Sequence, residues 1–240
     1  MQVQNDINPV MRGILVDWLV EVAEEYKLSA ENLYLSTNYV DRFLSVMPVL
    51  RGRLQLVGVT CMLIASKYEE IFAPQVEDFV YITDSTYSAS EVLHMEVTVL
   101  NALRFNLTAV TPMCFLTRLA SLLGFDEQHR HLSQYLAEIT IQEYSYLKYK
   151  PSQIATSAVC LTLHTMHENM LPPTLMRVLA LWQTDMDAIR ACCAELHTTH
   201  TRIYNKQRTL QASFEKYSHS KLSKVSLMPP RSLPPPFARD

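Results

Sequence analysis

The chain has 240 residues, of which 48% are hydrophobic and 19% charged, and its formal net charge is −3. This composition is that of a globular protein that buries one large core or two cores of about 100–120 residues each. Because the chain contains no basic tract, we expect it to bind neither nucleic acid nor an anionic membrane. It has no uncharged apolar run of about 18 residues and no signal peptide, so we expect an intracellular, soluble protein.

Turn-forming residues mark five predicted helices in the first half of the chain. Asn8-Pro9 supplies an N-cap and a proline in the first helical position, and Ser88-Ala-Ser-Glu91 forms a capping box. The five cysteines lie within such helical patterns without paired spacing, so we expect buried, reduced thiols. The predicted helices run from Pro9 to about Tyr26, from Ala30 to Met47, from after Gly52 to Ile71, onward from after Pro74, and from Ser88 to Leu103.

The same order then starts again, which indicates an internal duplication. Met11 and Ile14 match Met113 and Leu116, and the capping box is repeated near residue 184. The second set of predicted helices covers Pro112–Gly124, Asp126–Tyr146, a third helix after Pro151, a short fourth helix after Pro172, and Thr184–Tyr204. No segment alternates with period two, so we predict an all-α tandem repeat of two five-helix bundles. We expect domains at 1–109 and 110–225, followed by an extended, proline-rich tail at 226–240.

The first predicted helix is apolar almost all round, which is typical of a buried helix. Arg12 and Asp17 interrupt it, and buried charges are tolerated only when they are paired. Met11, Ile14, Leu15, Trp18 and Glu21 form a second stripe along the same helix. Residue type alone favours a core role for such a stripe, whereas exposure to solvent would make it a peptide-binding strip.

Four motifs resemble their counterparts in the A- and B-type cyclins, in order and spacing. They are Met11-Arg-Gly-Ile-Leu-Val-Asp-Trp-Leu19, Asn38-Tyr-Val-Asp-Arg-Phe-Leu44, Leu54-Gln-Leu-Val-Gly58 and Ala65-Ser-Lys-Tyr-Glu-Glu-Ile71. Lys216-Tyr-Ser-His-Ser-Lys221 resembles the family's carboxyl-terminal segment. The resemblance spans about residues 6–228 and favours the A type through Glu21 and Glu24-Glu25-Tyr26-Lys27, while the third predicted helix is somewhat more similar to the B type. It implies two cyclin boxes and a non-enzymatic, activating subunit of a cyclin-dependent serine/threonine kinase that acts in the cell cycle, without a cofactor, in nucleus and cytoplasm.

The resemblance also implies roles for individual residues. The surface that holds the kinase's regulatory helix would consist of Lys67, Tyr68, Glu96, Phe105 and Leu107. A docking patch for Arg-x-Leu motifs of substrates or inhibitors would consist of Met11, Ile14, Leu15, Trp18, Glu21, Arg51, Leu54, Gln55 and Ile82. Arg12 and Asp41 would form a buried ion pair between the first two helices. From residue type alone, Lys67 and Glu96 are instead ordinary surface residues.

Two other functions are weighed against this one. A transcription-type helical adaptor of the same fold would need a basic face, which the net charge does not support. A metal-dependent hydrolase could use Cys193, His197 and His200, which share one helical face, or the pair His164 and His167. A zinc site needs a further ligand and a closed surrounding shell, so we expect no metal here. No nucleophile elbow or phosphate-binding glycine loop is present, and we expect no catalysis.

Overall fold

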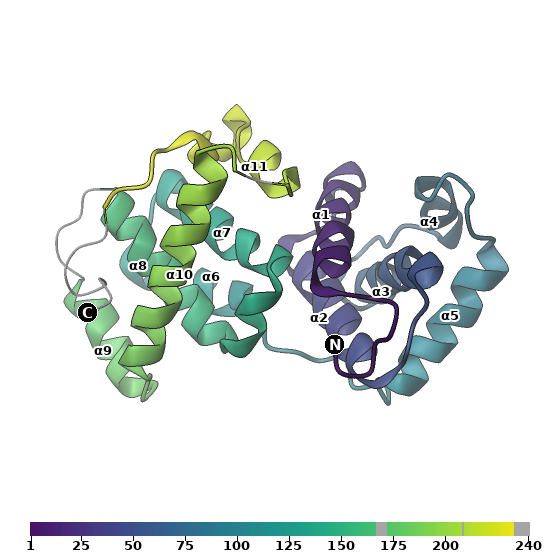
Figure 1. The fold of residues 1–240 in the computed structure, drawn as a ribbon. Helices are drawn as coiled ribbons and strands as arrows, with labels where there is room; N and C mark the ends of the chain where they lie inside the picture. Colours follow the sequence, from purple (N-terminus) through teal and green to yellow (C-terminus); the bar gives the residue numbers. More distant parts are fainter. Residues whose placement is uncertain (167–171, 208, 233–240) are drawn as a thin grey trace. The chain divides into compact units, whose positions relative to one another are not determined.

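The computed structural model describes residues 1–166, 172–207 and 209–232. In this part of the chain every regular element is an α-helix or a short 3-10 helix, as Figure 1 shows. Contacts divide the chain into two compact units, Met1–Ala109 and Val110–Asp240. The prediction of an all-α tandem repeat is therefore confirmed. No described helix has both the length and the apolar character needed to cross a membrane.

The first unit contains five α-helices whose ends follow the predicted capping residues. The Asn8 side chain accepts a hydrogen bond from the backbone N–H of Met11, and Ser88 and Glu91 form both bonds of the capping box. The elements are α1 (Pro9–Glu25), α2 (Ala30–Val46), the 3-10 helix η1 (Arg51–Arg53), α3 (Leu54–Glu69), α4 (Val76–Ile82) and α5 (Ala89–Ala102).

Helix α3 is the centre of this unit, and its neighbours pack around it as its small and apolar residues predict. Gly58 lies where α1 approaches most closely. A Cβ atom at Gly58 would stand only 2.6 Å from a methyl carbon of Leu15, which is shorter than any real contact of this kind. The absence of a side chain at Gly58 therefore fixes how deeply Leu15 enters the core.

The second unit repeats this plan around α8. Its elements are α6 (Pro112–Leu123), α7 (Glu127–Gln142), η2 (Tyr144–Lys148), α8 (Pro151–Thr165), α9 (Pro173–Leu181), α10 (Met186–Tyr204), α11 (Ala212–Lys216), η3 (Ser220–Leu222) and η4 (Val225–Leu227). Helices α6, α7 and α10 pack on α8, which is buried along most of its length.

Three sequence expectations differ from the structure. Helix α7 ends at Gln142 rather than Tyr146, because Glu143 is extended and the next turn is a 3-10 helix that buries Tyr146. The extended tail does not begin at Ser226, which is fully buried and donates its hydroxyl hydrogen to the carbonyl of Phe214. Cys114 is exposed because its face of α6 is turned to solvent, while the other four thiols are buried as expected.

The segment after α10 is held to the second unit by a buried carboxylate. Glu138 on α7 is 1% exposed and accepts hydrogen bonds from the Ser213 hydroxyl, the Lys216 ammonium and the Tyr217 hydroxyl. A buried charge is tolerated when it is paired and its lone pairs are satisfied. The segment whose sequence resembles the cyclin carboxyl terminus is thus anchored to this unit through Lys216 and the buried Tyr217.

Candidate functional site

Arg12 and Asp41 form the predicted ion pair between α1 and α2. Two parallel bonds join them, Nε to Oδ1 at 2.9 Å and Nη2 to Oδ2 at 2.6 Å. Arg12 is only 1% exposed, and the Asp41 side chain is 16% exposed. Bidentate geometry fixes the relative rotation of the two helices as well as their distance. The pair is therefore structural, and it orients the helix that carries the stripe beginning at Met11.

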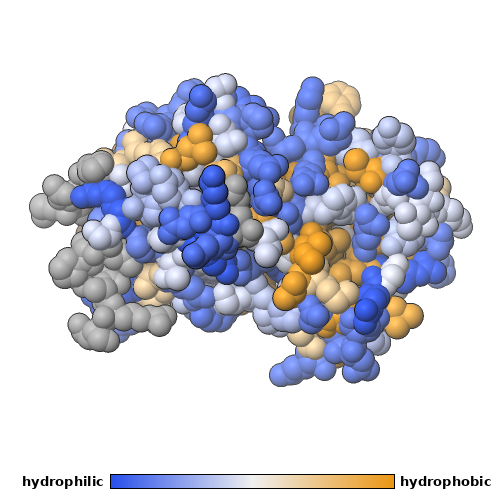
Figure 2. Space-filling model, turned by 45° about the horizontal axis from the view of Figure 1, so that its top comes forward, coloured by the Kyte–Doolittle hydropathy of each residue, from blue (hydrophilic) through white to orange (hydrophobic). Residues whose placement is uncertain are grey.

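That stripe lines a groove on the surface of the first unit. The docking groove, as we call it, has a volume of about 460 Å³ and lies between α1 and the start of α3. Ile14 is 57% exposed, whereas Leu15 belongs to the core and forms the floor. In Figure 2, hydrophobic residues, coloured orange, gather on the visible face of the first unit. The lining residues are Met11, Ile14, Leu15, Trp18, Arg51, Leu54 and Gln55.

Two residues predicted for the patch do not line this groove. Glu21 is exposed one turn beyond Trp18 on α1, and Ile82 is half-buried at the end of α4. Their participation stays a prediction. Arg51 is held at the rim by Asp6, whose carboxylate accepts its backbone and side-chain N–H groups at 2.8 Å. The side-chain hydrogen bond from Arg51 lowers the pKa of Asp6, so both groups stay charged at neutral pH.

A second surface contains an ion pair between residues 29 positions apart. The Lys67 ammonium lies 2.7 and 2.9 Å from the two carboxylate oxygens of Glu96. Lys67 is in the last turn of α3, where the helix dipole favours a cation, and Glu96 lies on α5. Residue type alone suggested two separate surface residues, whereas the resemblance implied one shared surface. In the structure the two side chains are in contact. We call this surface the Lys67–Glu96 face.

The loop after α5 places a large apolar side chain in solvent. Phe105 is 65% exposed and has a φ of +54°, a left-handed conformation that is costly for a non-glycine residue. The loop is held to α2 because the Tyr39 hydroxyl donates to the carbonyl of Leu107 at 2.9 Å and Arg42 donates to the carbonyl of Asn106. Leu107 is half-buried. Such rigid exposure of Phe105 is typical of a contact residue.

Tyr68 is tied to the same loop. Its ring is exposed, and its hydroxyl lies 2.9 Å from the hydroxyl of Thr108. The residue next to Lys67 on α3 is therefore joined to the segment that carries Phe105. All five residues predicted for the kinase surface belong to the first unit.

Two exposed hydrophobic residues were missed by the sequence analysis. Ile71 and Phe72 are 91% and 92% exposed, directly after the end of α3 that carries Lys67. A signal was available, because a proline follows at position 74 and an apolar pair in such a turn has no helix face to bury it. We add both residues to the candidate interaction surface.

The described candidate ligands Cys193, His197 and His200 do not converge on one point. The Cys193 thiol donates a hydrogen bond to the backbone carbonyl of Ser157. A ring nitrogen of His197 is hydrogen-bonded to the backbone carbonyl of Arg231. His200 is fully buried. Within the described ranges, no three histidine, cysteine or acidic side chains are placed to hold a metal ion. His167 lies outside them, so the pair His164 and His167 is not described.

Two five-helix bundles in tandem, each built around a central helix, define the class of this protein as a double helical repeat. Residues 1–108 match the family model for the cyclin N-terminal domain, and residues 110–231 match that for the cyclin C-terminal domain. The chain belongs to the cyclin family.

Individual relatives support the A type. The chain is 48% identical to human cyclin-A1 over 231 residues, which is 96% of this chain and 49% of that protein. It is 44% identical to the G2/mitotic-specific cyclin-A of Hydra viridissima over 238 residues, covering 98% of this chain and 55% of that protein. The chain thus spans about half the length of these curated relatives.

Solved structures with lower identity share the fold. A viral cyclin from herpesvirus saimiri superposes with a TM-score of 0.72 at 21% identity, covering 82% of this chain and 89% of that chain. A chain of the yeast RNA Pol II CTD kinase CTDK-1 complex gives a TM-score of 0.71 at 12% identity, covering 97% of this chain and 81% of that chain. At such identities the likeness supports the fold alone.

Proposed function

We propose that this chain is a regulatory, non-catalytic subunit that activates a cyclin-dependent serine/threonine kinase and thereby controls cell-cycle progression. The observation that carries the proposal is the Lys67–Glu96 face. It combines a solvent-facing ion pair with the exposed side chains of Tyr68, Phe105 and Phe72. Apolar groups of this size supply affinity in an interface, while charged groups fix orientation. The family membership and the A-type relatives support the same function.

The face acts as a rigid template for a mobile kinase helix. Lys67 and Glu96 together offer both donors and acceptors for backbone groups at a helix end, and α3 and α5 hold them in place. A subunit that binds only the inward position of the kinase helix shifts the kinase toward that conformation. The kinase's lysine–glutamate pair then forms and its activation loop is released.

The experiment compares two double variants of the chain mixed with a purified cyclin-dependent kinase. Lys67→Ala with Glu96→Ala is expected to abolish phosphorylation of a peptide without a docking motif. The matched control is Asp187→Ala with Arg190→Ala, which removes another exposed ion pair, 2.6 Å long, from α10. The control is expected to activate normally. Activation by the first variant at wild-type concentrations would remove this face from the mechanism, and a large fall in its melting temperature would make the pair structural instead.

We further propose that the docking groove recruits substrates or inhibitors that carry Arg-x-Leu motifs. The groove supports this because its walls are apolar and an indole ring lies in the lining, which suits a leucine side chain. Glu21, exposed on the same helix, supplies the carboxylate for the arginine. This role is independent of kinase activation. Variants of the groove should therefore reduce phosphorylation only of substrates that carry the motif.

We also propose that the protein acts in nucleus and cytoplasm, where cell-cycle kinases meet their substrates. A fluorescent fusion followed through the cell cycle tests this, and exclusion from either compartment throughout the cycle would contradict it.

A further inference from the structure

The second unit contains a pocket that neither proposed surface uses. It is bordered by the first turns of α6 and α8, the end of α9 and the residues that precede α10. Its volume is about 350 Å³, near the lower end of the range of about 300–1,000 Å³ that is usual for ligand pockets. A space of this size accepts one or two side chains of a partner rather than a large cofactor.

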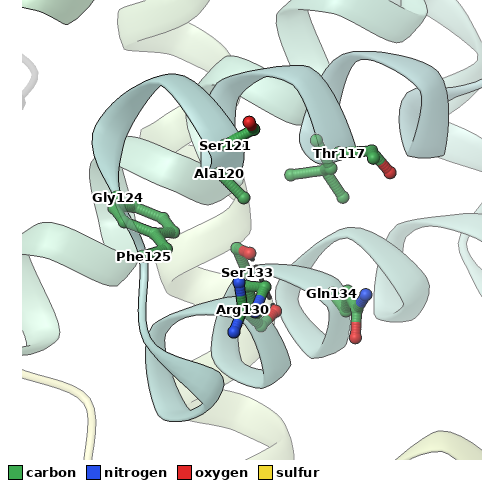
Figure 3. A pocket seen from close by; sticks show the side chains of 9 residues that line it. Thr117, Ala120, Ser121, Gly124, Phe125, Arg130, Ser133 and Gln134 are labelled. Atoms are coloured by element: carbon green, nitrogen blue, oxygen red, sulfur yellow. Dashed lines mark hydrogen bonds between the residues drawn. The ribbon is translucent and has the colours of Figure 1, made fainter.

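This pocket is separate from the cavity between α6 and α7. Figure 3 shows that cavity, which is lined by Ala120 and Ser121 of α6 and by Arg130 of α7. No described residue lines both spaces. With about 100° between successive residues of a helix, Phe115 lies on the face of α6 roughly opposite to Ala120 and Ser121. A ligand of one space therefore does not occupy the other.

An edge-to-face pair of aromatic rings forms the apolar part of the pocket. The ring centroids of Phe115 and Trp182 are 5.3 Å apart, and the ring planes make an angle of 72°. Both side chains are only half-buried, so they present apolar surface to a group that enters the space. Aromatic rings in this geometry pack well against a further ring or a large aliphatic side chain. We call the space the Phe115–Trp182 pocket.

Two hydrogen-bond donors in the lining have no acceptor among the described residues. Gln153 is 9% exposed, and its Oε1 atom accepts the backbone N–H of Lys150 at 2.8 Å. The NH₂ group of the Gln153 side chain is thereby left for a ligand, as is the indole N–H of Trp182. The backbone carbonyls of a bound peptide are suitable acceptors for such donors.

Lys150 supplies a positive charge without a counterion at the rim of the pocket. It forms no ion pair within the described ranges, whereas Lys148 is paired with Glu195 at 2.7 Å. Lys150 is also the N-cap residue of α8, a position that ordinarily takes Ser, Thr, Asp or Asn. The positive end of the helix dipole lies at the same place, so a cation there does not stabilise the helix. It favours an anionic group from a partner.

Asp185, the carboxylate in the lining, is already engaged. Its Oδ1 atom accepts the backbone N–H groups of Asp187 and Ala188 at 3.0 and 3.1 Å, which caps α10. The positive end of the α10 dipole offsets its charge. The charge that remains for a ligand is therefore that of Lys150.

The internal duplication places this pocket at a position related to the docking groove. The alignment that pairs Leu56 with Ile154 also pairs Gln55, which lines the groove, with Gln153, which lines the pocket. The hollow at the start of the central helix thus occurs in both units with different chemistry. In the second unit it combines aromatic rings with a cation.

We propose that the Phe115–Trp182 pocket binds a short segment of a partner protein in which a large apolar side chain is adjacent to an aspartate or glutamate. The apolar side chain packs against the two aromatic rings, and the neighbouring carboxylate pairs with Lys150. The NH₂ group of Gln153 donates to the backbone of the bound segment. The site shares no residue with the Lys67–Glu96 face or the docking groove.

The experiment uses the two tryptophans of the chain as separate reporters. In the whole chain labelled with ¹⁵N, the indole N–H signal of Trp182 reports on this pocket and that of Trp18 on the docking groove. The probe is acetyl-Gly-Glu-Phe-Glu-Gly amide. A saturable shift of the Trp182 signal, with the Trp18 signal unchanged, is the expected result. A Trp182 signal that does not move at any peptide concentration would overturn the proposal.

Recognition of the carboxylate is tested with a second peptide in which both glutamates are glutamine. The wild type should bind the glutamate peptide about two- to fivefold more tightly, the size expected for an exposed ion pair. Lys150→Gln should bind both peptides equally, whereas Lys150→Arg should retain the preference. The matched control is Lys206→Gln, since Lys206 is exposed and does not line the pocket. A preference that persists undiminished in Lys150→Gln would contradict the pairing with Lys150.

Recognition of the apolar side chain is tested with a third peptide in which alanine replaces phenylalanine. It should bind about tenfold more weakly or less, because the aromatic surface is no longer covered. Equal affinities for the alanine and phenylalanine peptides would also overturn the proposal. Kinase activation should be unchanged by Lys150→Gln, so failure here and failure of the proposed function are distinguishable.

Discussion

Leu15 and Gly58 meet at the point where α1 crosses the central helix α3. A Cβ atom at Gly58 would be 2.6 Å from one Leu15 methyl group and 3.2 Å from the other. Because Leu15 also forms the floor of the docking groove, the packing of the core and the shape of the groove depend on the same contact. A substitution in the core at Gly58 should therefore change peptide binding in the docking groove.

Gly58→Ala should weaken peptide docking and lower stability together. The new methyl group must displace Leu15, and overpacking of this kind costs about 1–3 kcal/mol. The displaced side chain moves toward the groove and reduces the space for a leucine of the bound peptide. Chemical denaturation and titration with an Arg-x-Leu peptide measure the two effects. Leu15→Ala removes both the clash and a buried side chain, so the loss of stability in the double variant should be smaller than the sum of the two single losses. An unchanged affinity in Gly58→Ala would disconnect the groove from this contact.

Trp18→Ala combined with Met11→Ala should weaken Arg-x-Leu binding by about 2 kcal/mol or more. Binding energy in such grooves is concentrated in a few anchors, and the indole is the largest apolar group in this lining. Kinase activation on a peptide without the motif should be unchanged. The measurement is phosphorylation of matched peptides with and without the motif. Equal loss on both would show that the two side chains support the core.

Asp41→Ala should destabilise the first unit by about 3–5 kcal/mol. The substitution leaves the Arg12 guanidinium buried without its carboxylate partner, and an uncompensated buried charge is costly. Urea denaturation followed by circular dichroism measures the loss. The double variant Arg12→Met with Asp41→Leu removes both charges and should recover much of the stability. If the single variant were as stable as wild type, the pair would contribute only orientation.

The helices could be predicted from sequence because their signals are local. Asn8-Pro9 and the box at Ser88 fix helix ends by hydrogen bonds within three residues, so their placement needed no knowledge of the fold. The end of α7 was wrong because it depends on burial of Tyr146, whose hydroxyl is hydrogen-bonded to Thr199, 53 residues later. Such a tertiary contact overrides a continuous helical pattern.

The candidate site could be predicted only in part, because its residues come together only in the folded chain. Nothing in the sequence pattern joins Lys67 to Glu96, and only the resemblance to cyclins placed them together. Ile71 and Phe72 were missed because an apolar pair at a helix end is read as core unless its exposure is known.

His200 makes the second unit sensitive to acid. It lies on α10, fully buried, with the ring of Tyr135 edge-on at 5.8 Å, and neither ring nitrogen has a hydrogen-bond partner among the described residues. Burial, with a smaller contribution from the charge of His197, lowers the pKa of His200 from 6.5 to about 4. The folded protein therefore holds a neutral imidazole that the unfolded chain would protonate more readily.

The direction in which stability changes with pH follows from proton binding. Because the unfolded state binds the additional proton, stability falls as the pH falls, beginning near 6.5 and continuing to about 4. The slope contributed by one such group is about 1.4 kcal/mol per pH unit. Denaturant midpoints measured between pH 7.5 and 4.5 test this, with His200→Phe as the variant and His129→Gln as the control, since His129 lies at the start of α7 beside Asp126. The wild type and the control should lose stability over this range, and His200→Phe should lose less. A pH profile of His200→Phe that is parallel to that of the wild type would assign the acid sensitivity to other groups.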